Sequence, residues 1–533
     1  MREAMLLGRC SNWAVSVLLA ALLVLGATPI PAQQRADVLI RGGMVIDGTG
    51  ASARQADVVI AGDRVVFVGD ARRGGYSAAR VIEARGLIVA PGFIDPHTHT
   101  YGDFQSDSAD RRLNAAYLMQ GVTTVITGND GSGPVDVSAH LANWEARGIG
   151  TNAALYVGFG TVRGKVLGMS PKAPSAEELA RMGTMVASGM DEGALGLSTG
   201  LYYAPQSYST TDEVITLAKH AAARGGVYDS HLRDESSYTI GLLGAVAEAL
   251  RIGREAGLPV HIAHIKALGL DVGGQSDSVI ALIVAARAAG QKVTADQYPY
   301  TASGTGVGAS LLPRWAEAGG RDSLRSRATN PEYRDRLYAE MSNNLRRRGG
   351  AKALLITDRD RPELVGKTLD DISRAKNADP VLTAIEIVLS GDASVASFNM
   401  NEEDITAFMK QSFVFTGSDG SDGHPRKYGT YPRKIRDYVL TRQVISLETM
   451  VRQSSGDVAD ALGIGLRGRL LPGMFADVIV MDTSAIKERA TYQHPDALAE
   501  GMRWVLVNGK LAVADGTLTG VAAGRGIRRA ASR

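Results

Sequence analysis

Cysteine is nearly absent from this chain of 533 residues. The single cysteine, Cys10, lies in an N-terminal segment with the features of a cleavable signal peptide, so we expect the mature chain to contain none. A chain without cysteine forms no disulfide bond and offers no thiolate to a metal ion. Any metal site must therefore be built from imidazole, carboxylate or modified lysine.

An excess of charge and a long hydrophobic run are also lacking. The formal net charge is only +2, so no bulk field attracts nucleic acid or an anionic membrane. We therefore expect no nucleic-acid partner. The main apolar stretch, residues 14–27, is shorter than the ~20 residues that a membrane span needs.

This apolar stretch instead has the flanks of a secretory signal. Arg2 and Arg9 precede it, and Ile30-Pro31-Ala32 follows it as a candidate cleavage site with small residues. We expect residues 1–32 to be a signal peptide cleaved near Ala32, which would make the protein periplasmic or secreted, with no stable membrane insertion after cleavage. An uncleaved signal anchor is the alternative.

Both ends of the remaining chain have sequence patterns that are typical of β-strands. Short β-branched runs that end in Gly or Asp begin at Asp37, Met44, Asp57, Arg64, Asp477 and Trp504. Asn508-Gly509 is a typical two-residue hairpin turn. We expect residues 33–91 and 464–520 to form one discontinuous β-sandwich domain. The basic tail, residues 521–533, is expected to be frayed and solvated.

The long middle of the chain alternates between short apolar runs and helical stretches. This alternation predicts a parallel α/β architecture, and residues 92–463 have room for a (β/α)8 barrel of ~250 residues plus an insertion. Residues 313–380 are rich in Arg, Asp and Asn and mostly helical in pattern, so they are the candidate insertion.

Histidines and aspartates follow several of these apolar runs, where a barrel builds its active site. His97 and His99 are two positions apart on an extended segment, so both rings face one side and can share a metal ion such as zinc. His231 and His264 each come at the end of a further run, and Asp419 ends another. His261 is three positions before His264, so we expect it to pack or form hydrogen bonds instead.

Four imidazoles and a carboxylate at strand ends can hold two divalent ions. Such ions acidify a bridging water, and a carboxylate beside that water can act as a general base. A bridging protein ligand is usually needed as well, and Asp130, at the end of another apolar run, is the candidate. A role in the turn before Gly131 is its alternative.

Several motifs, in one order along nearly the whole mature chain, resemble a known family. Pro91-Gly-Phe-Ile-Asp-Pro-His-Thr-His is similar to the opening signature of the amidohydrolase superfamily. The motifs that narrow the resemblance to the N-acyl-D-amino-acid deacylases (D-aminoacylases) begin at Gly121, Gly196, His231, Val260, Asp296, Gly417, His424 and Gly429.

The resemblance implies a metal-bearing (β/α)8 barrel with a β-sandwich made from both chain ends. It implies zinc, one or two ions, with Asp419 as ligand and catalytic acid/base and with Tyr203 on the scissile carbonyl. The implied zinc ligands are His97, His99, His231, His264 and Asp419. The residues implied to hold the substrate carboxylate are Lys266, Arg426, Tyr298 and Ser303.

Two positions depart from the family pattern. Asp130 stands where the family commonly has a cysteine that binds zinc, and Gln206 stands where the family usually has glycine, beside the expected substrate loop. A carboxylate can bridge two ions, so the first change leaves the number and identity of the metals open.

The function expected from the sequence is hydrolysis of N-acyl-D-amino acids, small molecules, to a carboxylate and a free D-amino acid. A dipeptidase or cyclic-amide hydrolase of the isoaspartyl dipeptidase or dihydroorotase kind is the alternative on the same scaffold. An inactive periplasmic binding protein is a remote second alternative. The preferred acyl group and side chain, and the oligomeric state, stay open.

Overall fold

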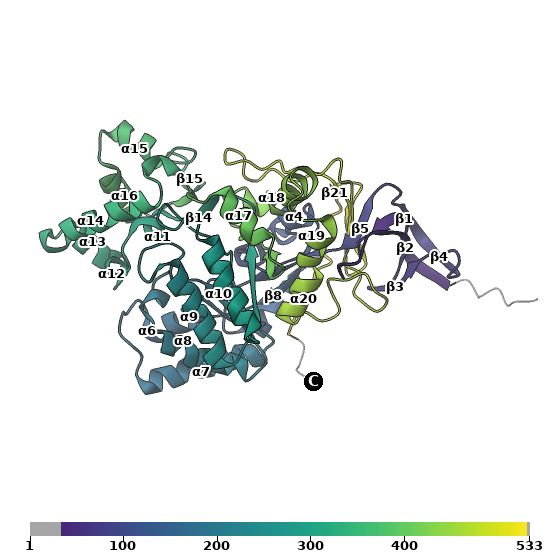
Figure 1. Ribbon diagram of the computed structural model, residues 1–533, viewed down its shortest axis with the longest axis horizontal. Coiled ribbons are helices and arrows are strands. Elements are labelled where there is room, and N and C mark those ends of the chain that lie inside the picture. Colours follow the sequence, from purple (N-terminus) through teal and green to yellow (C-terminus); the bar gives the residue numbers. More distant parts are fainter. Residues whose placement is uncertain (1–33, 530–533) are drawn as a thin grey trace, which may run out of the picture.

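The computed structural model describes residues 34–529, so the expected signal peptide lies outside the described residues. Two bodies dominate the view in Figure 1: a β domain at one end and a helix-rich body that contains the barrel. Within residues 34–529, no helix combines the length and apolar character needed to cross a membrane.

Strands from both ends of the chain share one nine-stranded sheet. The N-terminal strands are β1 (Gln34–Val45), β2 (Arg54–Ala61), β3 (Arg64–Gly69), β4 (Tyr76–Glu83) and β5 (Ile88–Pro91). The C-terminal strands are β18 (Val478–Met481), β19 (Met502–Val507), β20 (Lys510–Ala514) and β21 (Thr517–Leu518). The two groups join where β5 pairs antiparallel with β18, placing Val89 opposite Val480. Buried Val and Ile residues of both groups form one apolar cluster, which explains why both chain ends are needed for this domain.

The barrel consists of two parallel sheets that close on each other. One sheet contains β6 (Phe93–Asp95), β7 (Val122–Thr127) and β8 (Asn152–Leu155). The other contains β9 (Val157–Gly158), β10 (Gly196–Gly200), β11 (Val227–His231), β12 (Val260–Ile262), β13 (Val293–Gln297) and β17 (Val414–Thr416). Only Tyr156 separates β8 from β9, so these two strands occupy one position in the barrel. The two sheets together therefore supply eight parallel strand positions. A parallel bridge between Thr98, which follows β6, and Gly420, which follows β17, closes the barrel. The predicted fold class, an α/β barrel with an additional β domain, is confirmed.

Helices cover the outside of the barrel. The longer ones are α5 (Val137–Arg147), α6 (Phe159–Leu167), α7 (Ala176–Asp191), α8 (Thr211–Ala222), α9 (Gly241–Ala256), α10 (Ser276–Ala288) and α17 (Glu402–Met409). Further helices are α18 (Arg426–Arg433), η3 (Lys434–Thr441), α19 (Leu447–Gln453) and α20 (Gly456–Leu462). Short turns of helix are α2 (Tyr101–Gln105), α3 (Ala109–Arg112), α4 (Ala115–Leu118) and η1 (Gln206–Tyr208).

Helix α7 shows how the sequence produces this outer layer. Ser175 accepts a hydrogen bond from the backbone N–H of Glu178, whose side chain in turn accepts one from the backbone N–H of Ser175. This capping box begins the helix, and the buried stripe that includes Met182, Val186 and Met190 faces the barrel at helical spacing.

The insertion is larger than predicted and is not purely helical. It runs from β14 (Ala302–Gly306) to β16 (Ser394–Phe398). Strand β16 pairs antiparallel with both β14 and β15 (Leu354–Ile356), as the central strand of a three-stranded sheet. The helices of the insertion are α11 (Val307–Leu311), α12 (Arg314–Glu317), α13 (Arg321–Thr329), α14 (Pro331–Arg347), η2 (Ala351–Ala353), α15 (Leu369–Lys376) and α16 (Pro380–Leu389). It has its own apolar core and lies at the end of the molecule opposite the β domain (Figure 1). The limits 313–380 were too narrow because β14 and β16 are short and consist mainly of small residues.

The expectation of a frayed C-terminal tail was wrong for the residues that the structure describes. The backbone N–H of Gly524 donates to Ile149, and that of Ile527 donates to Ala153 on β8. Arg525 forms an ion pair with Asp63 of the β domain. The segment up to residue 529 therefore runs along the barrel, and Arg525 links this segment to the β domain.

Candidate metal centre and its pocket

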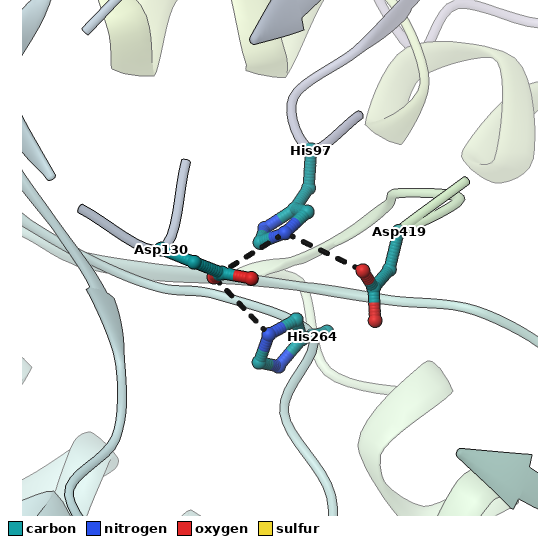
Figure 2. A group of neighbouring side chains, drawn as sticks. All are labelled: His97, Asp130, His264 and Asp419. Atoms are coloured by element: carbon teal, nitrogen blue, oxygen red, sulfur yellow. Dashed lines mark ion pairs between the residues drawn. The ribbon is translucent and has the colours of Figure 1, made fainter. Parts of the chain in front are cut away.

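The six predicted metal ligands all lie at the carboxyl ends of barrel strands. His97 and His99 follow β6, and Asp130 follows β7. His231 ends β11, while His264 follows β12 and Asp419 follows β17. Parallel strands in a barrel bring their carboxyl ends to one rim, which explains how residues over 300 positions apart meet. Figure 2 shows four of these side chains converging.

Asp130 occupies the centre of this group. Its Oδ1 atom lies 3.5 Å from His97 Nε2, 3.6 Å from His231 Nδ1 and 3.5 Å from His264 Nε2. Its Oδ2 atom lies 3.5 Å from His99 Nε2. One carboxylate thus faces all four imidazoles, which is the placement that a ligand shared by two ions requires.

Asp419 lies on the open side of the group. Its Oδ1 atom is 3.0 Å from His99 Nε2 and 3.6 Å from His97 Nε2, and its Oδ2 atom is 2.8 Å from Arg426 Nη1. Burial opposes ionisation, but the charges of Arg426 and His264 outweigh it and hold the pKa of Asp419 below its ordinary value. The carboxylate is therefore ionised at neutral pH, as a metal ligand and general base must be.

The donor set fits a divalent metal ion. Tetrahedral zinc holds N and O ligands at about 2.0–2.2 Å, which separates neighbouring ligand atoms by about 3.3–3.6 Å, close to most of the distances above. Both ring nitrogens of the fully buried His97, and Oδ1 of Asp130, have no hydrogen-bond partner in the described structure. Buried polar atoms are costly to leave unpaired, so these atoms are explained by a ligand that the protein itself does not provide.

Backbone strain gathers at the same residues. Asp130, His264 and Asp419 have φ angles of 56°, 34° and 47°, in the left-handed region that residues other than glycine rarely adopt. Strain of this kind persists where surrounding structure holds a functional geometry, which agrees with a metal centre at these positions.

Buried side chains that are not themselves predicted ligands hold the ligand residues in position through hydrogen bonds. His261 is fully buried, and its Nε2 atom lies 2.9 Å from Asp296 Oδ2. Asp296 Oδ1 accepts a hydrogen bond from the backbone N–H of His264. Asp95 similarly accepts hydrogen bonds from the backbone N–H groups of His97 and Ser418. His261 therefore forms a hydrogen bond with a supporting aspartate, whereas His264 lies among the predicted metal ligands.

Lys266 has a carboxylate partner that was not anticipated from the sequence. Its Nζ atom lies 2.5 Å from Glu235 Oε1 and 2.7 Å from His264 Nδ1, so a carboxylate of the protein already neutralises it. Burial opposes ionisation of Glu235, but Lys266 and His231 outweigh it and lower the pKa of this carboxyl. Sequence reasoning missed Glu235, although its position four residues after His231 was a signal that it faces the same site.

The predicted substrate residues, Lys266 included, line one pocket beside the predicted metal ligands. Tyr203, Tyr298, Ser303 and Arg426 all contribute to its wall. The Tyr203 ring packs 4.8 Å from the ring of the ligand His231, and burial raises the pKa of its hydroxyl, which therefore stays protonated as a donor. The Arg426 guanidinium lies 4.7 Å from the Tyr298 ring.

Gln206 does not line this pocket but supports the loop of Asp130. Its amide nitrogen donates to the backbone carbonyl of Asp130, and its amide oxygen accepts from the backbone N–H of Gly200. The side chain is buried and contacts Gly131 where a Cβ atom would clash. The two departures from the family pattern, Asp130 and Gln206, are therefore in direct contact.

Comparisons with known proteins agree with this geometry. A model of the amidohydrolase family matches residues 80–277. A D-aminoacylase of Alcaligenes xylosoxydans xylosoxydans is 32% identical over 525 residues, covering 93% of this chain and 98% of the relative. An N-acyl-D-glutamate deacylase of the same organism is 32% identical over 503 residues, covering 90% and 93%.

Solved structures give the same result. A D-aminoacylase structure, described with a binuclear metal centre, matches with a TM-score of 0.79 at 32% identity over 93% of this chain and 100% of that one. The N-acyl-D-glutamate deacylase of Bordetella bronchiseptica, solved with zinc and a phosphonate that mimics the tetrahedral intermediate, matches with a TM-score of 0.78 at 30% identity, with the same coverage.

Proposed function

The chain belongs to the D-aminoacylase family of amidohydrolases, and from this we propose that it is a zinc-dependent hydrolase of N-acyl-D-amino acids. The products are a carboxylate and a free D-amino acid. The observation that carries the proposal is the position of Asp419, an ionised carboxylate in the pocket lining, 3.0 Å from His99 and 2.8 Å from Arg426.

We propose that zinc, when present, would be held by His97, His99, His231, His264, Asp419 and Asp130, the carboxylate that faces all four imidazoles. When bound, zinc polarises the amide carbonyl and lowers the pKa of a water molecule.

The chain's own residues then move the protons and hold the substrate. Asp419 accepts the proton of the attacking water and later delivers it to the leaving nitrogen, so that one water adds across the amide bond. The Tyr203 hydroxyl donates to the carbonyl oxygen as negative charge develops there. Arg426, beside Tyr298, offers its guanidinium to the α-carboxylate, which selects N-acyl amino acids over simple amides.

The direct test is a side-by-side assay of zinc-loaded protein on four substrate classes. These are N-acetyl-D-amino acids, their L-enantiomers, isoaspartyl dipeptides, and cyclic amides such as hydantoin and dihydroorotate. We expect kcat/KM for the D-enantiomers to exceed the others by at least about ten-fold, the discrimination that a pocket reaches when its polar groups are left unpaired by the wrong substrate. Preferential hydrolysis of dipeptides or cyclic amides would reject the proposal, as would inactivity of a zinc-loaded protein.

We also propose that the protein acts outside the cytoplasm. The support is the sequence of residues 1–32. Two arginines precede an apolar stretch, and a candidate cleavage site that ends in the small residue Ala32 follows it. N-terminal sequencing of protein recovered from a periplasmic or culture fraction should begin at or near Gln33. Recovery of the intact N-terminus from a membrane fraction would favour the signal anchor.

A further inference from the structure

A buried guanidinium in the pocket wall has no carboxylate partner. Arg348, only 2% exposed, lines the pocket directly after helix α14. Its Nε atom donates to the hydroxyl of Tyr238 at 2.6 Å, and its terminal nitrogens lie 3.2 Å from the Tyr202 hydroxyl and 3.4 Å from Ser303 Oγ. Over residues 34–529, none of its side-chain contacts is an ion pair.

Lys266 and Arg426, the two cations that the family resemblance assigned to the substrate, each have a carboxylate partner within the protein. Lys266 pairs with Glu235 at 2.5 Å, and Arg426 pairs with Asp419 at 2.8 Å. A buried charge is expensive unless it is both paired and hydrogen-bonded, and hydroxyl groups supply only the second of these. Arg348 is thus a permanent cation that lacks a counter-ion, in a pocket that binds a charged substrate.

The position of Arg348 places it at the amino-acid end of the pocket. Strand β14 runs between two guanidinium groups: Ser303 lies against Arg348, and a Cβ atom on Gly304 would lie 3.1 Å from Arg426 Nη2. The hydroxyls of Tyr202 and Tyr238 hold the Arg348 fork in place, which lowers the entropy cost of binding an anion. A substrate lying against this strand meets one guanidinium on each side.

We propose that Arg348 binds a carboxylate on the side chain of the substrate's amino-acid part, so that the enzyme prefers N-acyl derivatives of acidic D-amino acids. The inference rests on the proposed function and narrows its substrate class. Arg426 takes the α-carboxylate, and Arg348 takes the second carboxylate through charge-assisted hydrogen bonds.

The test compares N-acetyl-D-glutamate with the isosteric, neutral N-acetyl-D-glutamine. For the wild type we expect kcat/KM to favour the glutamate derivative by about 10- to 100-fold, the range that hydrogen bonds to charged groups span. Arg348→Gln should reduce this ratio to near one, mostly through KM. The aspartate and asparagine derivatives, assayed in parallel, show which side-chain length the subsite favours.

Arg346→Gln is the matched control. Arg346 lies two residues earlier on α14, its side chain is 54% exposed, and it pairs with Asp271 away from the pocket. This variant should keep the wild-type ratio. An Arg348→Gln variant that loses both activities in the same proportion, or a wild type with equal activity on both substrates, would overturn the subsite while leaving the proposed function intact.

Product inhibition of the wild type provides a measurement that needs no variant. D-Glutamate should inhibit with a Ki at least about ten-fold lower than that of D-glutamine, for the same charge-assisted reason. Equal Ki values would overturn the inference even if Arg348→Gln failed to fold. Inactivity on every N-acyl-D-amino acid would instead reject the proposed function, and calorimetric binding of the two free amino acids would then decide the subsite alone.

Discussion

Asp419→Asn is expected to lower kcat by at least about a thousand-fold, within the upper range for loss of a general acid/base, while zinc remains bound. The amide is isosteric and keeps an oxygen where Oδ1 lies 3.0 Å from His99. It cannot accept the water proton or return it to the leaving nitrogen. Initial rates on the best N-acetyl-D-amino acid, together with zinc content by mass spectrometry, measure both parts of this expectation.

Asp422→Asn serves as the control for Asp419→Asn. Asp422 is three residues further along the same loop, has a side chain that is 64% exposed, and pairs with Lys427 and Arg111 instead of a metal ligand. It should retain zinc and activity close to those of the wild type. An Asp419→Asn enzyme with a near-wild-type kcat would remove Asp419 from the chemistry. Loss of zinc from that variant would reduce its role to that of a ligand.

The barrel, and the gathering of the predicted metal ligands at one end of it, could be predicted from the sequence because both depend on a simple geometric rule. Parallel strands end at one rim, so a histidine or aspartate directly after an apolar run is placed there regardless of sequence separation. The shared β domain followed from similar runs at both chain ends. Strands β14 and β16 were missed because a few small residues carry no clear period, and only pairing with each other makes them strands.

The chemistry around the ligands was harder to predict because it depends on which side chains pair in space. Lys266 lines the pocket, but its ion pair with Glu235 was not apparent from the sequence. Nothing in the local sequence could show that Arg348, in an insertion expected to be mostly helical, lies in the pocket wall beside two tyrosines. Gln206 was correctly marked as unusual, but its contact with the Asp130 backbone became apparent only in the structure.

These pairings change how the pocket's charges are understood. Of the three cations Lys266, Arg426 and Arg348, the first two face carboxylates of the protein. Arg426 faces Asp419 through Nη1, while its buried Nε has no hydrogen-bond partner in the described structure, so this guanidinium still has a donor for an α-carboxylate. No carboxylate of the described chain pairs with Arg348. The two arginines therefore fit two different carboxylates of one substrate.

Asp130→Ala is expected to reduce zinc from two ions per chain to one or fewer and to lower kcat/KM by at least about a hundred-fold. Even partners that only orient metal ligands are typically worth 10- to 100-fold in metal affinity or activity, and Asp130 faces all four histidines directly. The substitution removes the one carboxylate that faces all four imidazoles, and with it an anion that would offset the charge of bound metal.

Two further variants separate the bridging role from a role in the turn before Gly131. Asp130→Cys restores the residue that the resembling family commonly has, and a soft thiolate should retain one tightly bound zinc and part of the activity that Asp130→Ala loses. Asp136→Ala, an exposed aspartate that precedes α5 in the same connection, should change neither zinc content nor rate. If Asp130→Ala kept two ions and full activity, Asp130 would be a turn residue. If only Asp130→Cys recovered, the carboxylate would be this chain's substitute for a thiolate, in a sequence whose single cysteine is Cys10.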